Sequence, residues 1–330
     1  MFILAIHKKY LTEELIQERW LGKLHSIKIG HLRILDHLML GFAGDASSAA
    51  LLKHTSHPMT AVPMGSWNQI KQAFCEGELH GAFIPAPEAM VLFDSGMDIK
   101  ILLFDIRPGA YLTSNRSGDA DKLVNFKGKT ILISDYLSVY HLMLYRLMAS
   151  AGLEAGLENS GNADVYIEMV PPFILPEMLI HDHSGDIGGC FIEEPFGSLS
   201  IESGWGRLIC HSSNLWPDHP SSVLVFHDYV INDYRNHLMD VIHLMVASSR
   251  FIYSGSNDLS RLSHSFFDQK TGGIEQMFAS FLPKNPVSLM PDIQSLEIIN
   301  RFMVKDMGIM ERLINIGNLV DTSFALEAGA

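Results

Sequence analysis

The feature that most constrains the fold of this chain is the alternation of strand patterns with helix patterns over most of its length. Residues 66–79 have helical spacing, with Ser66 as a plausible cap and with Ile70 and Phe74 facing inward. The strand patterns are short and apolar, and they cover residues 26–32, 80–87, 98–106, 126–134, 163–170 and 185–193. This alternation is typical of an α/β protein, so we expect mixed, mainly parallel sheets with flanking crossover helices.

The C-terminal part of the chain follows a different pattern. From Asn232 onward helical spacing dominates, and residues 292–319 form a second helical stretch. The apolar face of the first stretch carries Leu238, Val241, Ile242, Met245 and Ile252. We therefore expect a helical C-terminal tail on the α/β body.

The N-terminal segment lacks the order of a secretory leader. Residues 1–6 are apolar, but no basic segment precedes them and His7 follows at once. Residues 11–21 have helical spacing and are expected to form a peripheral leading helix. No run approaches the roughly 18 apolar residues of a membrane span. As written, the chain is expected to be cytoplasmic, with no direct membrane span; a missing leader would make it periplasmic or membrane-associated.

The charge balance argues against one broad class of partner. The chain has 330 residues, with 24 Lys and Arg against 37 Asp and Glu, and its formal net charge is −13. A nucleic-acid binder needs a basic surface to neutralise phosphates, whereas the longest basic cluster here is residues 8–9. The three cysteines show no CxxC spacing, which argues against a disulfide framework and a structural zinc site. We expect no nucleic-acid partner, no metal and no cofactor.

Two adjacent acids end an apolar strand in "GGCFIEEP", residues 188–195. Burying a charge is costly, so Glu193 and Glu194 need a reason to lie there. A pair of acids suits general acid–base chemistry, but adjacent strand residues point to opposite faces and would not share a proton. We expect one to face solvent and the other a cleft or a helix N-terminus. This favours a binding or structural role over a catalytic dyad.

Other chemical signals are weaker. "HDHSGD", residues 181–186, brings two histidines and two aspartates close enough for a metal site, but it reads more readily as a solvated turn. The sequence has no G-x-S-x-G elbow, no cysteine beside a recognisable histidine partner, and no phosphate-binding glycine loop. We therefore assign no catalytic residue and expect that the protein is not an enzyme.

Five longer stretches occur in an order that is fairly specific. They are "IKIGHLRILDHLMLGFA" (27–43), "SWNQIKQAFCEGELHGAFIPAPEAM" (66–90), "LVNFKGKTILISDYLSVYHLMLYRLMASAGLE" (123–154), "GGCFIEEPFGSLSIESGWG" (188–206) and "NLWPDHPSSVLVF" (214–226). Together they resemble the substrate-binding proteins of ABC importers for nitrate, bicarbonate and sulfonates. The last two are similar to the family's G-E-P-W segment and its W-x-x-H-P-E-K/E signature.

The resemblance implies a two-lobed type II periplasmic-binding-protein fold. Lobe 1 would comprise residues 1–107 and 209–330, including the N-terminal helix and the C-terminal helices. Lobe 2 would comprise residues 108–208. Two crossovers would join the lobes, and a small ligand would be held in the cleft between them as they close by a hinge motion.

The resemblance also assigns positions in that cleft. Trp67 matches the tryptophan that covers the anion, although it also reads as a plain helix anchor. His141 belongs to the polar start of a lobe 2 helix but also reads as a core histidine, and Glu194 also reads as a structural contact between lobes. The predicted ligand-binding residues are Asp36, Trp67, Ser138, Tyr140, His141, Glu194 and Ser222.

Ser222 is the main departure from the family pattern. The nitrate binders carry a lysine at this place and the bicarbonate binders a glutamate. The missing lysine removes the charge partner of nitrate, and the missing glutamate leaves the bicarbonate-type metal arrangement incomplete. The loop after Asp36 also lacks the family's E-K-G-F-F segment. The resemblance therefore carries over the fold and the cleft, but not the ligand.

Three hypotheses about function follow. The first is a solute-binding protein that holds a small anion or polar metabolite and serves an ABC permease and ATPase. The second is a cytoplasmic ligand sensor on the same fold, similar to nitrate sensors, with a regulatory protein as its partner. The third and least favoured is an enzyme like the thiamine-pyrimidine synthases, because only Cys190 remains of the cysteine-rich run of that family.

Overall fold

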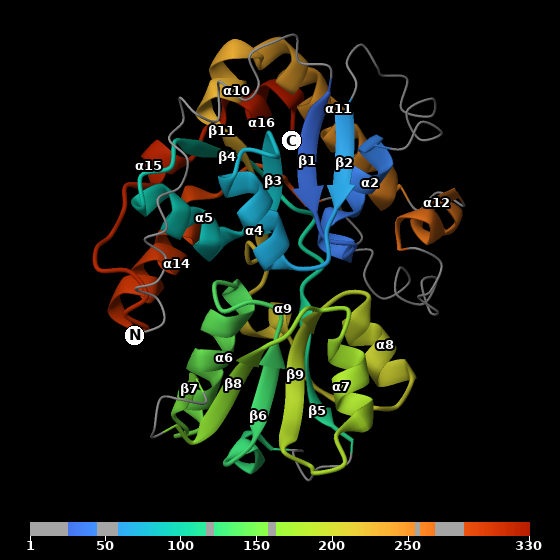
Figure 1. The fold of residues 1–330 in the computed structure, drawn as a ribbon, viewed down its shortest axis with the longest axis vertical. Helices are drawn as coiled ribbons and strands as arrows, with labels where there is room; N and C mark the ends of the chain where they lie inside the picture. Colours follow the sequence, from blue (N-terminus) through green and yellow to red (C-terminus); the bar gives the residue numbers. More distant parts are fainter. Residues whose placement is uncertain (1–25, 45–58, 117–121, 158–162, 255–257, 268–286) are drawn as a thin grey trace.

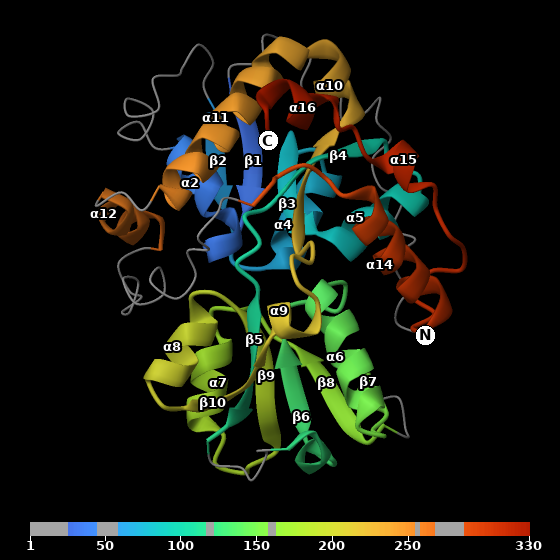
Figure 2. The same ribbon diagram turned by 180° about the vertical axis from the view of Figure 1, so that it is seen from behind.

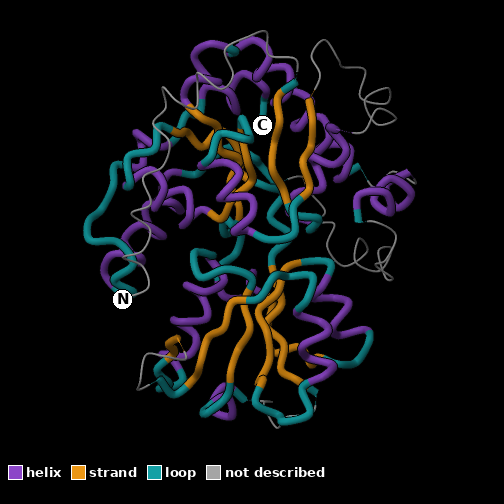
Figure 3. The backbone as a smooth tube through the Cα atoms, viewed as in Figure 1, coloured by secondary structure: helices purple, strands orange, loops and turns teal. Residues whose placement is uncertain are grey.

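The protein is built around two sheets, one above the other in Figure 1. This computed structural model describes residues 26–44, 59–116, 122–157, 163–254, 258–267 and 287–330. The leading helix expected at 11–21 lies outside the described residues. Loops fill the zone in which the two bodies meet (Figure 3).

The first sheet has five strands in the order β2-β1-β3-β11-β4. Its strands are β1 (Ile27–His31), β2 (Met59–Pro63), β3 (Gly81–Pro85), β4 (Ile99–Phe104) and β11 (Ser222–His227). Strand β1 runs parallel to β2 and β3, whereas β11 is antiparallel to both β3 and β4. A strand from late in the chain therefore completes a sheet that begins near residue 27.

The second sheet has six strands in the order β10-β5-β9-β6-β8-β7. They are β5 (Ala110–Asn115), β6 (Thr130–Ile133), β7 (Ala155–Leu157), β8 (Val165–Met169), β9 (Ile187–Glu193) and β10 (Gly206–His211). Strands β7, β8, β6 and β9 are parallel, and β5 is antiparallel to β9 and β10. The expectation of mixed, mainly parallel sheets is confirmed.

Helices flank both sheets (Figures 1 and 2). Around the first sheet lie the 3-10 helix η2 (Leu35–His37), α2 (Leu38–Gly44), α4 (Trp67–Cys75), α5 (Ala86–Asp94), α10 (Asp228–Asp233), α11 (Arg235–Tyr253), α12 (Asp258–Phe266), α14 (Ile293–Lys305), α15 (Ile316–Leu319) and α16 (Ser323–Ala328). Around the second lie η3 (Leu123–Phe126), α6 (Val139–Ser150), α7 (Leu175–His181), α8 (Phe196–Glu202) and α9 (Ser212–Leu215).

Local sequence explains where several of these helices begin and end. The Ser66 hydroxyl caps α4 by accepting a hydrogen bond from the backbone N–H of Gln69 at 3.2 Å. The helix ends at Cys75, shortly before Gly77, whose positive φ of 66° a glycine adopts without strain. The whole predicted apolar face of α11 is buried, as expected. The expected helix at 292–319 is shorter, because α14 ends at Lys305.

The first sheet buries both of its faces. On β3, Ala82 and Ile84 belong to one apolar cluster, while Phe83 between them belongs to the other. The cluster that contains Ala82 continues into the second sheet, where it includes Leu132 and Phe191. The two bodies are therefore joined by a shared apolar core as well as by the chain.

Candidate functional site

The chain crosses between the sheets twice, and the two crossings touch each other. The first crossing leads from β4 to β5 and contains Asp105; the second leads from β10 to β11 and ends at Ser222. Oδ2 of Asp105 accepts hydrogen bonds from the backbone N–H of Ser222 at 2.7 Å and from its hydroxyl at 2.6 Å. The side chain of Asp105 is thus fixed at the point where both crossings meet.

A second carboxylate, that of Asp36, lies beside this point. Asp36 is in η2, directly after β1, and is 1% exposed. The hydroxyl of Ser221 lies 2.6 Å from Oδ2 of Asp36 and 2.7 Å from Oδ2 of Asp105. A hydroxyl has one proton to donate, so both contacts are hydrogen bonds only when one carboxyl also carries a proton. Burial, and then the charge of Asp105, raise the pKa of Asp36 well above its usual value, which assigns the proton to Asp36.

His37 joins this hydrogen-bond network through the hydroxyl of Ser222. Its Nδ1 accepts a hydrogen bond from the backbone N–H of Leu32 at 3.0 Å, which leaves its Nε2 as the donor to the Ser222 hydroxyl at 3.0 Å. Burial lowers the pKa of His37 well below its usual value, so the ring is neutral. It therefore adds a hydrogen bond but no positive charge.

The second sheet contributes Tyr140, at the start of α6. Its ring is 3% exposed and lies 5.4 Å from the ring of Phe191 and 5.7 Å from that of His219. Burial raises the pKa of Tyr140 well above 10, and the nearby carboxylates of Asp36, Glu193 and Asp105 raise it further. Tyr140 of the second body therefore faces the carboxylates of the first.

The side chains of the two adjacent glutamates point in different directions, as expected, but neither faces solvent. Both are 1% exposed, so the expectation that one of them is solvated is wrong. Both carboxylate oxygens of Glu194 accept hydrogen bonds from Ser198, one from its backbone N–H at 2.8 Å and one from its hydroxyl. Glu194 thus binds a backbone N–H in the first turn of α8 from just before its N-cap, Pro195, and this is the helix N-terminus that the sequence allowed.

Glu193 is the member of the pair that faces Asp36. One of its oxygens accepts a hydrogen bond from the Ser134 hydroxyl, while Oε2 has no hydrogen-bond partner in the described part of the chain. Burial raises the pKa of Glu193 to about 7, and the charge of Asp135 adds to the shift. Sequence reasoning gave Glu193 no ligand role; its spacing of one residue from Glu194 was the only available signal.

Ser138 and His141 make local contacts at the start of α6. The Ser138 hydroxyl accepts from the backbone N–H of His141 at 3.2 Å and donates to the carbonyl of Asp135 at 2.8 Å. Nδ1 of His141 donates to the carbonyl of Tyr136 at 2.7 Å. Their predicted ligand contacts stay predictions.

Trp67 lies on the first body, at the start of α4. Its indole ring is 5% exposed and meets the ring of His37 edge-on, with 5.4 Å between the ring centres. The indole N–H has no hydrogen-bond partner among the residues that the structure describes. Trp67 is therefore linked through His37 to Ser222 and Asp105.

Unpartnered buried polar atoms gather in this region. Within the part of the chain that the structure describes, they include Asp36 Oδ1, Trp67 Nε1, the Tyr140 hydroxyl, Glu193 Oε2 and His219 Nε2. The Tyr140 hydroxyl lies near that of Ser221, but no hydrogen bond of good geometry joins them. Buried polar groups are nearly always paired, so a group of exceptions at one place points to a ligand that pairs them.

The predicted turn at 181–186 is a turn in the structure. Oδ1 of Asp182 accepts from the backbone N–H of Gly185 at 3.0 Å, and Oδ2 accepts from that of Ile187 at 3.0 Å. No group of three or more His, Cys, Asp or Glu suited to a metal ion occurs among the described residues.

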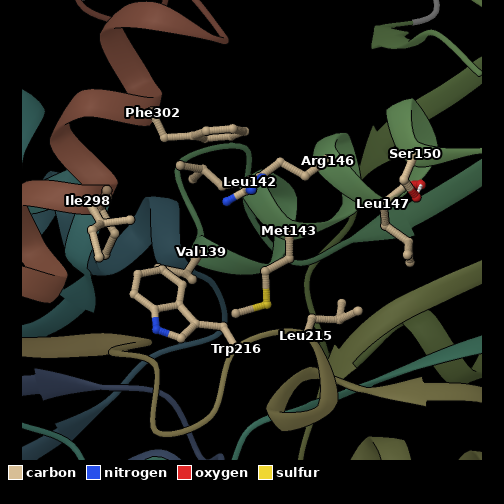
Figure 4. A pocket seen from close by; sticks show the side chains of 11 residues that line it. Val139, Leu142, Met143, Arg146, Leu147, Ser150, Leu215, Trp216, Ile298 and Phe302 are labelled. Atoms are coloured by element: carbon tan, nitrogen blue, oxygen red, sulfur yellow. Dashed lines mark hydrogen bonds between the residues drawn. The ribbon is translucent and has the colours of Figure 1, made fainter.

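A separate pocket of about 450 Å³ opens between the two bodies, beside α6, α9 and α14 (Figure 4). In Figure 4, Phe302 and Ile298 of α14 face a stripe of side chains along α6. Its lining residues are Val139, Leu142, Met143, Arg146, Leu147, Ser150, Leu215, Trp216, Ile298, Ile299 and Phe302. This pocket is mainly apolar and holds none of the predicted ligand-binding residues.

Comparison with known families identifies the chain. A family model described as the NMT1-like family matches residues 22–261. This chain belongs to the NMT1-like family. It is also 21% identical over 273 residues to the nitrate import ATP-binding protein NrtC of Synechocystis, a match that covers 79% of this chain. The chain spans only 40% of the length of that relative.

Solved structures confirm the two-lobed binding-protein fold. The ligand-binding component of an ABC-type import system from Staphylococcus aureus, with zinc bound, has a TM-score of 0.75 and 18% identity, covering 92% of this chain and 99% of its own. The periplasmic nitrate-binding protein NrtA of Synechocystis has a TM-score of 0.75 and 12% identity, covering 93% and 89%. The alkanesulfonate-binding protein SsuA of Xanthomonas axonopodis, bound to MOPS, has a TM-score of 0.73 and 14% identity, covering 92% and 100%.

The same fold also occurs in an enzyme. The desulfurization enzyme DSZB has a TM-score of 0.63 and 12% identity, covering 92% of this chain and 99% of its own. The fold by itself therefore does not decide between binding and catalysis. Among the described residues, no helix is both long and apolar enough to cross a membrane.

Proposed function

We propose that this chain is the solute-binding component of an ABC importer of the nitrate, bicarbonate and sulfonate type. It would hold a small anion or polar metabolite where the two lobes meet, and deliver it to a permease and its ATPase. The lobes would divide close to the bounds that the sequence suggests, 1–107 with 209–330 and 108–208, but with the second boundary moved past β10 and α9, which lie with the second sheet.

The group of buried, unpartnered polar atoms around the crossings carries this proposal. Asp36 and Trp67 come from the first body, and Tyr140 and Glu193 from the second. A ligand that pairs such atoms binds only when both bodies contribute, which couples binding to closure of the lobes. Four of the seven positions implied by the family resemblance, namely Asp36, Trp67, Tyr140 and Ser222, belong to this network.

The state of Cys190 favours binding over thiol chemistry. Cys190 is fully buried in β9, and its sulfur lies 3.3 Å from the Thr113 hydroxyl. Burial raises the pKa of this thiol to about 12, so the reactive thiolate is not populated near neutral pH. The third hypothesis, an enzyme of the thiamine-pyrimidine type, is the least supported.

Transport is favoured over the sensor hypothesis because the relatives named above include an import ATP-binding protein, the ligand-binding component of an ABC-type import system and a periplasmic nitrate-binding protein. A location outside the cytoplasmic membrane, as in the periplasmic neighbours, would fit this role.

Ligand-dependent stabilisation tests the proposal. Nitrate, nitrite, bicarbonate, sulfonates, pyrimidines and small amines would each be added while the unfolding midpoint and the tryptophan emission are recorded. A ligand at a hundredfold its Kd should add about 2.7 kcal/mol to the free energy of unfolding. Glu327→Gln, in the exposed ion pair with Arg235, is a matched control that should respond like the wild type. If no compound shifts the midpoint or the emission, the binding role is overturned.

A further inference from the structure

The place where the lobes meet is strongly acidic. Asp36, Asp105 and Glu193 are each at most 1% exposed. Asp36 is within electrostatic range of the other two, and all three act on the hydroxyl of Tyr140. Three carboxyl groups thus surround one point that water does not reach.

Within the described part of the chain, no positively charged side chain forms an ion pair with Asp36, Asp105 or Glu193. The guanidinium of Arg107 is directed to the backbone carbonyls of Asp218 and Ser288, and only its backbone N–H donates to Asp105. Lys71 pairs with Glu88 at 3.5 Å. The remaining groups that face the carboxyls are acidic or neutral.

The two neighbouring histidines do not supply the charge either. Burial lowers the pKa of His37 well below its usual value and that of His219 to about 4, so both rings are neutral at physiological pH. Asp135, which faces Glu193, is a fourth acid, and the charge of Lys71 acts on Asp135 and Glu88 rather than on the three carboxyl groups. Burying several carboxylates without a cation is costly, so closure of the lobes needs either bound protons or a positive ligand.

The unpartnered acceptor atoms favour the second of these alternatives, a positive ligand that donates hydrogen bonds. Asp36 Oδ1 and Glu193 Oε2 are acceptors without a donor, one from each body. The aromatic rings of Trp67 and Tyr140 lie in the same network, and aromatic faces attract cations. A fully deprotonated anion such as nitrate would add to the negative charge and bring no donor to either oxygen.

We propose that the ligand of this site carries a protonated nitrogen, such as an ammonium, guanidinium or amidinium group, which donates to Asp36 and Glu193. This inference rests on the proposed solute-binding function and narrows its ligand from any small polar solute to an organic cation. It is also compatible with Ser222, a neutral side chain that brings no positive charge to the site.

The proton on Asp36 gives the proposal a second signature. In the ligand-free protein, Asp36 donates that proton to the Ser221 hydroxyl, which in turn donates to Asp105. A cation that pairs with Asp36 replaces the proton as its counter-charge, so binding should release a proton to the buffer. As the pH rises, the affinity for the cationic ligand should therefore increase by up to about tenfold per pH unit while the site is protonated. It should level off once the carboxyl groups of the site are ionised.

Three probes of one planar shape isolate the effect of charge. Guanidinium, urea and nitrate would be compared at 10 mM and constant ionic strength at pH 8, by thermal unfolding and by calorimetry in two buffers that differ in ionisation enthalpy. We expect guanidinium, but not urea or nitrate, to raise the unfolding midpoint saturably and to release a proton. Methylammonium and ethanolamine extend the series to primary amines.

Glu193→Gln should weaken guanidinium binding at least tenfold, and Asp36→Asn should do the same and abolish proton release. Glu327→Gln is the charge-matched control and should bind as the wild type does. If Asp36→Asn does not fold, the affinity of Glu193→Gln for guanidinium still tests the cation proposal. Stabilisation by nitrate or by urea equal to that by guanidinium would overturn the cation proposal and leave the binding role intact. Failure of every cation overturns the cation proposal as well, and failure of the whole panel overturns both.

Discussion

The hydroxyl of Ser221 lies 2.6 Å from Oδ2 of Asp36, although 185 residues separate the two in the chain. The same hydroxyl reaches Asp105, which sits on the other crossing between the sheets. One serine thus connects the loop after the first strand with both crossings. This connection ties Asp36 to the point where the chain crosses between the two bodies.

Replacing this serine tests its role directly. Ser221→Ala leaves Oδ2 of Asp36 without a partner and removes one donor from Asp105. A buried polar atom left unpaired costs about 1–3 kcal/mol, so the free energy of unfolding should fall by that amount. Urea unfolding at pH 7 measures it. Ser150→Ala, whose exposed hydroxyl donates to the carbonyl of Leu147, should change it by less than about 0.5 kcal/mol. Equal losses in the free energy of unfolding of Ser221→Ala and Ser150→Ala would contradict the role assigned to Ser221.

Stability should fall as pH rises through the mildly acidic range. The pKa of Glu193 is raised from 4.5 to about 7 in the folded protein, so the folded state binds a proton that the unfolded state has already lost. Its stabilising contribution is complete below about pH 4.5 and is lost as pH rises to 7 and above. The loss from this group is up to about 3 kcal/mol. Burial also raises the pKa values of Glu194 and Glu88 to about 7, so the whole protein should show the same trend.

Glu193→Gln isolates the contribution of that one group. The amide cannot ionise and can still accept a hydrogen bond from Ser134. The variant should therefore lose less stability than the wild type between pH 5 and pH 8, and it should be the more stable protein at pH 8. Urea unfolding at the two pH values gives both numbers. Parallel pH profiles would show that Glu193 titrates normally.

Trp67 offers a way to separate packing from hydrogen bonding. Trp67→Ala removes a buried indole and should cost about 3–5 kcal/mol of stability. Trp67→Phe keeps most of the apolar surface and removes an N–H that has no partner in the ligand-free protein, so it should cost less than about 1.5 kcal/mol. Because a ligand would pair that N–H, the Phe variant should still weaken binding of whichever compound stabilises the wild type. Unchanged affinity in Trp67→Phe would remove the indole N–H from the site.

Much of the fold could be predicted from the sequence, because period-two and helical patterns report burial locally. The capped start of α4 at Ser66 and the buried face of α11 are examples. Strand β11 is fully buried, as the predicted β3 is, but it was not predicted as an element, because its residues were interpreted only as part of the family signature at 214–226. The site was harder for a different reason. Asp105 and Ser221 carry no pattern of their own, and only the antiparallel return of β11 between β3 and β4 brings them together.

The buried thiols should be slow to react. Burial raises the pKa of both Cys75 and Cys190 to about 12, and each side chain is at most 4% exposed. Cys210 is only partly buried, and burial raises its pKa as well. At pH 8 a disulfide reagent should therefore label Cys210 first, and should label the other two only at the rate of unfolding. Rapid labelling of Cys190 in the folded protein would revive the enzyme hypothesis.

Gly189, directly before Cys190, sets how closely β9 approaches β5. A Cβ added to Gly189 would lie 1.9 Å from the backbone carbonyl oxygen of Thr113, and backbone cannot rotate out of the way as a side chain can. Gly189→Ala should therefore separate the two strands and cost more than about 3 kcal/mol, or prevent folding. Gly317→Ala is the control, because its Cβ would meet only a side-chain oxygen of Asn315 at 3.2 Å. Soluble yield and urea unfolding compare them. Since β9 carries Glu193 at its end, a Gly189→Ala protein as stable as the control would mean that β9 is not held against β5, and the position of Glu193 would lose its structural basis.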